Sequence, residues 1–284
     1  MRILVTGYSG QLGYDVVREG VNRGIDMVGI GSKELNITDG PSVKEFIHEK
    51  NPDAIIHCAA YTAVDKAEDD KEKCWKVNVE GTTHLANAAK EIAAKFMFIS
   101  TDYVFEGLGK VPFIESDVPN PVGFYGITKY EGEKVVQSLL NEWFIVRISW
   151  VFGMNGTNFV KKILELTEKC SELNIVGDQI GSPTYTFELS RLLLDMIQTE
   201  RYGIYHATNE GFCSWAEFAN EIFHITNKRI KVNTITSEEY PTRAVRPKNS
   251  RMSKQKLIDN GFNPLPSWQE ALEHFLTNLK LEGK

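Results

Sequence analysis

The chain opens with a short apolar run, Ile3-Leu4-Val5, that leads into Thr6-Gly7-Tyr8-Ser9-Gly10-Gln11-Leu12-Gly13. The run is short, continuous and partly β-branched, as buried parallel strands are. Glycines three residues apart, between a strand and a helix, are typical of a dinucleotide-binding turn. Gly7 would permit the tight turn, Gly10 would let the backbone approach a pyrophosphate, and Gly13 would let the helix pack closely on the strand. The alternative is an ordinary tight connection between a strand and a helix.

Strand-like and helical patterns alternate through the first half of the chain. We expect strands at 2–6, 26–30, 54–58, 96–100 and 144–148, and helices at 11–23, 43–50, 71–94 and 125–140. This alternation predicts an α/β fold with right-handed βαβ units, namely a Rossmann-type doubly wound parallel sheet. Beyond about Val151 the pattern is less regular, with helices expected at 158–170, 187–199, 214–225 and 268–281 and a strand at 173–176. We therefore expect a dinucleotide-binding domain at 1–152 and a smaller C-terminal α/β substrate-binding domain at 153–284, with approximate boundaries across which segments interleave.

The composition excludes several classes of protein. Hydrophobic residues make up 42% and charged residues 25% of the 284 residues, as in ordinary globular proteins. The net charge of −6 argues against nucleic acid as a partner. No apolar run approaches the roughly 18 residues that a membrane span needs, and no signal peptide precedes the first strand. We expect a cytoplasmic protein with no membrane partner. The cysteines form neither a Cys-x-x-Cys pair nor a disulfide framework, and they are Cys58, Cys74, Cys170 and Cys213.

A tyrosine and a lysine stand one helical turn apart in Tyr125-Gly126-Ile127-Thr128-Lys129, so they share a helix face. A free tyrosine has a pKa of about 10. We expect the neighbouring ammonium group of Lys129 to lower the pKa of Tyr125 toward the range useful for proton transfer. Lys129 could also hold a nicotinamide ribose. The alternative is an accidental pair on a solvated helix, and the glycine turn upstream favours the catalytic interpretation.

The fourth expected strand ends in Ser100-Thr101-Asp102-Tyr103. A hydroxyl group at the carboxyl end of a parallel strand faces the ligand crevice, so Thr101 could bind a substrate carbonyl and hold it for reaction. The alternative is that Thr101 is only a β-branched strand residue.

The residues after the second expected strand bear on the choice of cofactor. They read Ile30-Gly31-Ser32-Lys33, without the acidic residue that usually binds the adenosine ribose of NAD. Ser32 and Lys33 could instead bind a 2′-phosphate, which favours NADPH with NADH tolerated, unless Lys33 is merely a solvated surface charge. After the third strand, the small residues of Ala59-Ala60-Tyr61 could lie against a cofactor or be small for packing.

At these residues the chain resembles the extended short-chain dehydrogenase/reductase superfamily and, more narrowly, the dTDP-4-dehydrorhamnose reductases. The Tyr-x-x-x-Lys pattern is shared by the whole superfamily. The more specific segments are Ser100-Thr101-Asp102-Tyr103-Val104-Phe105, Asp178-Gln179-Ile180-Gly181-Ser182-Pro183-Thr184 and Arg246-Pro247-Lys248-Asn249-Ser250. The matching segments run in family order from residue 7 to about residue 250.

The resemblance implies reduction of the 4-keto group of dTDP-4-dehydro-6-deoxy-L-mannose to dTDP-L-rhamnose, for use in a polysaccharide. It implies that Tyr125 protonates the carbonyl oxygen, that Lys129 tunes this tyrosine and binds ribose, and that Thr101 binds the same oxygen. The cofactor site would comprise Gly7, Gly10, Gln11, Leu12, Gly13, Ser32, Lys33, Asn36, Ile37, Ala59, Ala60, Tyr61, Tyr125 and Lys129.

The resemblance also implies the contacts to the sugar nucleotide. Asp102 and Trp150 would contact the sugar, as would Thr101. The diphosphate would be bound by Arg243 and Arg246, with Lys248 beside them, because guanidinium groups match phosphate oxygens. The alternative for these cations is a basic surface loop.

Some members of the resembled family dimerise around a magnesium ion held by glutamates. Asp15 and Glu188 stand at two of these positions, the first with a shorter side chain. The resemblance therefore admits Mg²⁺ as a cofactor and a homodimer as the assembly, although we assign no metal ligands.

Two other functions compete with this one. A sugar-nucleotide dehydratase would need a glutamate after Asp102, where this chain has Tyr103. A sugar-nucleotide epimerase or another reductase would use the same tyrosine and lysine. A non-catalytic regulatory subunit resembling that of methionine adenosyltransferase is the third alternative, against which the intact Thr101, Tyr125 and Lys129 argue.

Overall fold

The computed structural model of the chain describes residues 1–282. A sheet of six strands lies at its centre, in the order β10-β5-β4-β3-β1-β2, and every pairing in it is parallel. The strands are β1 (Arg2–Thr6), β2 (Asp26–Ile30), β3 (Ala54–His57), β4 (Lys95–Thr101), β5 (Trp143–Ile148) and β10 (Gly203–His206). The predicted α/β class with a doubly wound parallel sheet is confirmed.

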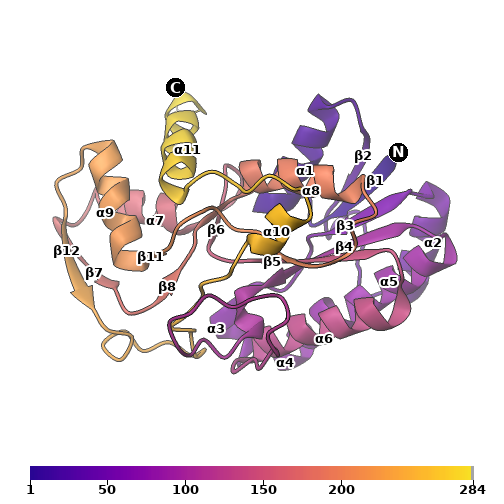
Figure 1. Cartoon of the computed structure of the whole chain (residues 1–284), viewed down its shortest axis with the longest axis horizontal. Coiled ribbons are helices and arrows are strands. Elements are labelled where there is room, and N and C mark those ends of the chain that lie inside the picture. Colours follow the sequence, from indigo (N-terminus) through magenta and orange to yellow (C-terminus); the bar gives the residue numbers. More distant parts are fainter. Residues whose placement is uncertain (283–284) are drawn as a thin grey trace.

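Helices cover both faces of this sheet (Figure 1). One face carries α1 (Gln11–Asn22) and α8 (Thr186–Ile197), and the other carries α2 (Gly40–Lys50), α5 (Gly81–Glu91) and α6 (Phe124–Leu139). Side chains alternate along a strand, so Ile3 and Val5 join the first hydrophobic core while Leu4 joins the second. A strand buried on both sides must be apolar at every position, which explains the continuous apolar run in β1.

The strand order reverses between β1 and β3, which creates the crevice where ligands of such sheets bind. The turn after β1 therefore runs directly against the end of β3. Gly7 has φ +71°, and a Cβ atom there would lie 2.7 Å from the amide nitrogen of Ala59. A Cβ atom on Gly13 would overlap the carbonyl group of Gly7. Two of the three glycines are thus required by close contacts within the fold.

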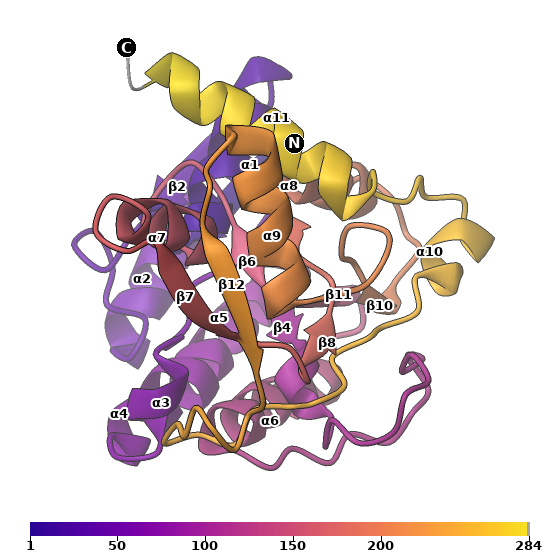
Figure 2. The same ribbon diagram turned by 90° about the vertical axis from the view of Figure 1, so that its left-hand side faces the viewer.

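A second hydrophobic assembly lies to one side of the sheet, at the left in Figure 1 and toward the viewer in Figure 2. It contains a parallel strand pair, β7 (Glu172–Val176) with β12 (Lys231–Ile235), under the helices α7 (Phe159–Leu166), α9 (Trp215–Thr226) and α11 (Trp268–Glu282). Further short elements are α3 (Val64–Ala67), α4 (Lys71–Trp75), the 3₁₀ turn η2 (Asp102–Val104), β6 (Val151–Phe152), β8 (Ile180–Gly181), β9 (Thr184–Tyr185), β11 (Cys213–Ser214) and α10 (Gln255–Asp259).

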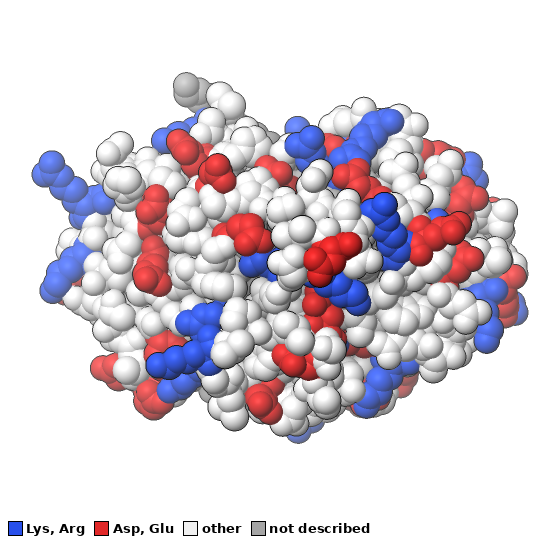
Figure 3. Space-filling model, in the orientation of Figure 1, with Lys and Arg blue, Asp and Glu red and all other residues white. Residues whose placement is uncertain are grey.

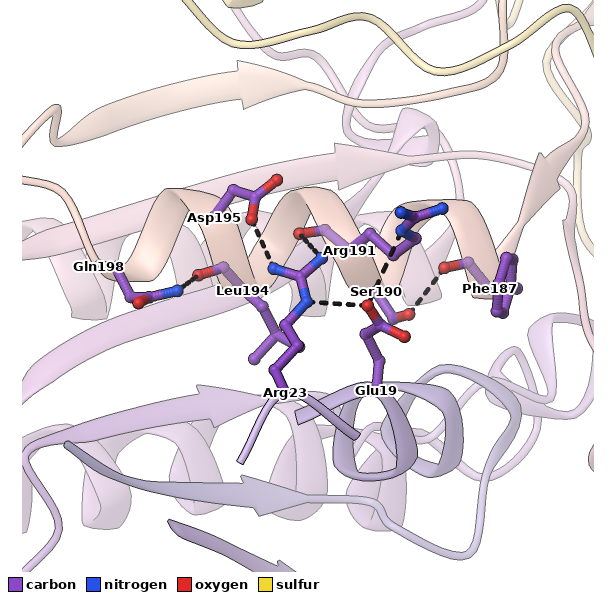
Figure 4. A network of polar contacts seen from close by, with 8 residues as sticks. All are labelled: Glu19, Arg23, Phe187, Ser190, Arg191, Leu194, Asp195 and Gln198. Atoms are coloured by element: carbon purple, nitrogen blue, oxygen red, sulfur yellow. Dashed lines mark hydrogen bonds and ion pairs between the residues drawn. The ribbon is translucent and has the colours of Figure 1, made fainter. Parts of the chain in front are cut away.

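Two segments from the second half of the chain pack with the first half. Strand β10 extends the sheet beside β5, and α8 packs on α1. Figure 4 shows Arg23 at the end of α1 reaching both Glu19 and Asp195, the latter on α8. The division into domains at residue 152 stays a prediction, and β10 and α8 are the segments that interleave across it.

The helix expected at 71–94 is interrupted. A π-helical turn at Lys76–Glu80 separates α4 from α5. Within this turn the buried amide group of Asn78 accepts a hydrogen bond from the Tyr61 amide at 2.7 Å and donates to the Thr128 hydroxyl at 2.9 Å. The pattern of apolar and polar side chains does not reveal a π-helical turn, because the helical segments on either side of the turn keep the usual helical spacing.

The sequence pattern also misplaces or omits a few elements. Helix α7 ends at Leu166 rather than Cys170, and β10 and β12 were not expected. None of the helices within residues 1–282 is both long and apolar enough to cross a bilayer. On the face of the molecule in Figure 3, acidic and basic side chains are interspersed.

A buried ion pair lies beneath the carboxyl edge of the sheet. Arg147 on β5 and Glu133 on α6 are 1% and 0% exposed and form two hydrogen bonds, at 2.9 and 2.7 Å. The Ser100 hydroxyl donates to the same carboxylate. Removal of one partner would leave the other charge buried without compensation.

We expect Glu133→Ala to lower the free energy of unfolding by about 3–5 kcal/mol. The matched control is Glu131→Ala on the same helix, whose carboxylate pairs with Lys134 at the surface and should cost less than about 1 kcal/mol. Chemical denaturation followed by circular dichroism measures both. Equal midpoints for the two variants would contradict this assignment.

Candidate active site

A cavity of about 550 Å³ opens at the carboxyl ends of β1 to β5. Most of the residues predicted for the site line it, namely Gly7, Gly10, Gln11, Leu12, Gly13, Ser32, Asn36, Ile37, Ala59, Ala60, Thr101, Asp102, Tyr125, Lys129 and Trp150. The structure therefore brings the glycine turn, the Tyr/Lys pair and the end of β4 around one space. Lys33, Tyr61, Arg243 and Arg246 are not among the lining residues.

The glycine turn ends at the N-terminus of α1, which borders the cavity. Gly10 precedes the first helical residue, no side chain caps the helix, and its first turn holds no acidic residue. The free amide groups of a helix N-terminus attract anions. A pyrophosphate fits this end of the cavity, because glycine leaves the backbone uncovered.

The Tyr125 hydroxyl lies close enough to Thr101 for the Thr101 side chain to lower its pKa, so the two predicted catalytic groups are neighbours. The Thr101 hydroxyl donates to Asp102 Oδ1 at 3.0 Å and accepts from the Tyr103 amide at 3.2 Å. The Tyr103 ring meets the Tyr125 ring edge-on, with centroids 5.6 Å apart. These contacts fix the position of the Tyr125 ring.

Burial governs the acid–base properties of the tyrosine and the lysine. Burial raises the pKa of Tyr125 above its usual value, and the neighbouring Thr101 side chain opposes this only in part. Burial lowers the pKa of Lys129 to about 7, against the opposing charge of Glu133. The ammonium nitrogen lies 4.0 Å from the centroid of the Phe98 ring. The expectation that Lys129 lowers the pKa of Tyr125 is wrong. Burial removes water from the Tyr125 hydroxyl and raises its pKa by more than Lys129 lowers it, because burial also disfavours the charged form of Lys129.

Asp102 is a buried carboxylate in the cavity wall, 3% exposed. Its Oδ2 atom has no hydrogen-bond partner among the described residues. Burial raises the pKa of Asp102 to about 6, against hydrogen bonds that lower it. Buried acceptors are almost always paired, so this oxygen suits a ligand that donates a hydrogen bond.

Trp150 forms a strained aromatic wall of the cavity. Its backbone has φ +49°, which is rare for a bulky residue. The indole stacks on Trp215 with ring centroids 3.7 Å apart, and it packs so closely on Gly181 that a Cβ atom there would lie 2.8 Å from it. The surrounding contacts thus hold Trp150 in a costly conformation, as is common at ligand sites.

The two arginines predicted to bind diphosphate are held by aspartates. Arg243 pairs with Asp69 at 2.9 Å, and Arg246 pairs with Asp65 at 2.8 Å. Arg246 lies close enough to Tyr103, a lining residue, to lower its pKa, so this arginine lies just behind the cavity wall. Its Nε atom is buried and has no partner among the described residues.

The end of β2 differs from the sequence-based interpretation. Ser32 lines the cavity, whereas Lys33 is exposed outside it. A carboxylate is present after all, since the Gly31 amide donates to Glu34 Oε2 at 2.8 Å. Glu34 stands three residues beyond the glycine, and only the turn of the chain brings it back to the strand end.

The magnesium expectation gains no support from the structure. No group of three or more histidine, cysteine, aspartate or glutamate side chains suited to a metal was found within residues 1–282. The carboxylate of Asp15 accepts a hydrogen bond from the Thr186 hydroxyl on α8, which joins α1 to that helix. The homodimer stays a prediction.

The structure adds residues that no sequence signal singles out. Asn78 supports the helix that carries the Tyr/Lys pair through its bond to Thr128, whose hydroxyl donates to the Tyr125 carbonyl at 2.8 Å. In the sequence, Asn78 shows only as a polar residue between two valines. Further lining residues, such as Ser9, Thr38, Cys58 and Ser149, follow from their places near strand ends.

Comparisons with known proteins agree with this geometry. The family model described as the RmlD substrate binding domain matches residues 1–281. The dTDP-4-dehydrorhamnose reductase of Sinorhizobium fredii is 38% identical over 295 residues, covering 100% of this chain and 99% of its own.

Two solved structures of dTDP-4-dehydrorhamnose reductases are also similar. The protein from Clostridium acetobutylicum has a TM-score of 0.96 and 40% identity, with 99% of this chain and 100% of that chain covered. The protein from Bacillus anthracis, solved in complex with NADP, has a TM-score of 0.95 and 41% identity, with 98% and 99% covered. The chain belongs to the RmlD substrate binding domain family and, within it, stands with the dTDP-4-dehydrorhamnose reductases.

Proposed function

We propose that this protein reduces the 4-keto group of dTDP-4-dehydro-6-deoxy-L-mannose with NADPH and produces dTDP-L-rhamnose. The observation that carries the proposal is the meeting of Thr101, Tyr125 and Lys129 with the glycine turn around one cavity. The names of similar proteins support the substrate, and the NADP complex of the Bacillus anthracis relative supports the cofactor. The cytoplasm, which supplies NADPH, is the compartment that suits this reaction.

When bound, NADPH supplies a hydride to C4 of the sugar. Tyr125 donates the proton that the carbonyl oxygen takes up, which requires a protonated hydroxyl at neutral pH. The raised pKa of Tyr125 keeps the proton on its hydroxyl at neutral pH, although a pKa closer to neutrality would make it a better proton donor. Thr101 lies beside the Tyr125 hydroxyl in the cavity wall, where it could bind the same carbonyl oxygen. Lys129 lies one helical turn away on the cavity wall, positioned to hold the ribose next to the nicotinamide.

The rest of the cavity would hold the sugar nucleotide. Asp102 would accept a hydrogen bond from a sugar hydroxyl through its unpaired oxygen, and Trp150 would pack against the sugar ring. Arg246 would donate its free Nε–H to the diphosphate, and Arg243 would add charge from the surface. Residues 1–152 would then serve mainly the cofactor and residues 153–284 mainly the sugar nucleotide.

The direct test uses the purified protein, NADPH and enzymatically generated keto sugar. Substrate-dependent loss of the NADPH absorbance, with formation of dTDP-rhamnose, supports the proposal. An epimerase would interconvert sugars without net consumption of NADPH, and a purely regulatory subunit would do neither.

We expect Tyr125→Phe to lower kcat by at least about 100-fold, because the proton donor is lost, while NADPH affinity stays within about twofold. Steady-state kinetics and fluorescence titration of NADPH measure the two quantities. The matched control is Tyr130→Phe on the same helix, since Tyr130 packs against a separate hydrophobic cluster. Equal turnover in Tyr125→Phe and the parent would disprove the catalytic assignment.

Asp102 gives a prediction about stability and pH. Its pKa rises from 3.8 in the unfolded chain to about 6 in the fold, so the folded state binds more protons between these values and stability falls as pH rises through them. We expect D102N to remove this cost and to be more stable than the parent by about 2–3 kcal/mol near about pH 8, with little difference near about pH 4. Denaturation midpoints across this range measure the effect. A constant difference at every pH would contradict a buried, costly carboxylate.

We expect Arg246→Ala to weaken binding of dTDP by at least about fivefold, since about 1 kcal/mol is the smallest loss expected for a charged hydrogen bond. Isothermal titration calorimetry measures the change. Arg229→Ala, at an exposed position beyond α9, serves as the control. If Arg246→Ala bound dTDP as tightly as the parent, Arg246 would not bind the diphosphate and would serve only to pair with Asp65.

A further inference from the structure

The helix that carries Tyr125 begins without a cap from its own segment. Helix α6 starts at Phe124, its N-cap residue Gly123 has no side chain, and its first turn holds no acidic residue. The first amide groups of a helix have no partners within the helix, so they need acceptors from elsewhere. Tyr125 is the second residue of α6, so the position of the proposed proton donor depends on what holds this first turn.

Glu68 supplies an acceptor from another element. It follows α3 directly, and its Oε1 atom accepts a hydrogen bond from the Phe124 amide at 2.8 Å. A Cβ atom on Gly123 would lie 3.2 Å from the same oxygen, so glycine leaves room for the carboxylate to reach the helix. Ala67, the residue before Glu68, is fully buried, which fixes the backbone from which the carboxylate extends. A carboxylate bonded to an amide at a helix N-terminus also complements the helix dipole.

The first turn of α6 is held from other sides by close backbone contacts. Gly126 packs against the Tyr103 carbonyl of η2, which a Cβ atom at this position would overlap. The Thr128 hydroxyl donates to the Tyr125 carbonyl at 2.8 Å. Neither contact occupies the amide group at the very start of the helix. Glu68 is therefore the side chain that ties this start to a neighbouring element.

Lys129 lies one turn farther along α6 and is held by contacts that do not involve Glu68. Its side chain is buried, and the preceding residue, Thr128, accepts a hydrogen bond from Asn78 at 2.9 Å. Loosening of the first turn would consequently displace Tyr125 and leave Lys129 in place. Loss of Glu68 should thus impair proton transfer, which needs Tyr125, without impairing cofactor binding, which needs Lys129.

We propose that Glu68 is a positioning residue for the reduction. Its hydrogen bond to the Phe124 amide fixes the first turn of α6 and so keeps the Tyr125 hydroxyl beside Thr101, where the carbonyl oxygen of the sugar receives its proton. Glu68 is not among the residues that line the cavity, so it acts through the helix rather than by touching a ligand. The inference rests on the proposed function, in which Tyr125 is the proton donor.

The test compares Glu68→Ala, which removes the acceptor, with Glu68→Gln, which keeps an oxygen of the same reach. Kinetics are measured well below the thermal midpoints of the variants. We expect Glu68→Ala to lower kcat by at least about tenfold, because a small displacement of a catalytic group costs this much or more. The dissociation constant for NADPH should stay within about twofold of the parent, and Glu68→Gln should keep most of kcat.

The matched control is Glu72→Ala on α4. The Glu72 carboxylate pairs with Lys76 at the surface, so this variant should have the kcat of the parent.

Amide hydrogen exchange provides a second measurement that needs no turnover. In Glu68→Ala, residues 123–127 should exchange faster than in the parent, while residues 128–139 should keep the parent's rates. If Glu68→Ala does not fold, Glu68→Asp takes its place with the same expected results, because its carboxylate is too short to reach the Phe124 amide.

A lower thermal midpoint with an unchanged kcat would overturn the inference and leave Glu68 as a cap that only stabilises the fold. Equal losses of kcat in Glu68→Ala and Glu68→Gln would overturn it too, because charge rather than position would then be responsible. Parallel losses of kcat and of NADPH affinity would have the same consequence. The proposed function fails separately, if the parent does not oxidise NADPH with the keto sugar, and exchange at residues 123–127 then still decides whether Glu68 holds the first turn.

Discussion

The close approach of the turn after β1 to the end of β3 is the constraint on which the rest of the structure depends. Gly7 adopts a left-handed conformation against Ala59, and Gly13 packs against Gly7. A side chain at either position would push the first helix away from the sheet. The crevice between β1 and β3 would then lose both its shape and the free helix N-terminus that suits a pyrophosphate.

Buried polar groups hold the reactive residues from behind. Asn78 ties the π-helical turn to the helix of Tyr125, and the pair of Glu133 and Arg147 joins that helix to β5. Removal of water from this region raises the pKa of Tyr125 and lowers the pKa of Lys129 to about 7. Burial thus makes the site costly for stability and disfavours the charged forms of both the tyrosine and the lysine.

Local signals in the sequence predict the centre of the site but not its surroundings. The glycine turn, Thr101 and the Tyr125–Lys129 pair lie as expected, because each depends on spacing within one element or on its position at a strand end. The fold-back of Glu34 and the aspartate partner of Arg246 depend on turns and on contacts between distant segments. Strand β10 completes the sheet from beyond residue 200 through a pairing with β5 that is distant in sequence. Whether the pKa of Tyr125 is raised or lowered depends on how deeply its side chain is buried, and the neighbouring residues in sequence do not determine that burial.

Isotope labelling of the transferred hydride tests most directly the central claim that the protein reduces C4 of the sugar. NADPH deuterated at C4 of the nicotinamide, on the transferred face, is incubated with the keto sugar and a stoichiometric amount of protein, and the product is examined by nuclear magnetic resonance. The proposed function predicts one deuterium at C4 of dTDP-L-rhamnose and none elsewhere in the sugar. A sugar product without deuterium, with the label still on the nicotinamide, would contradict it.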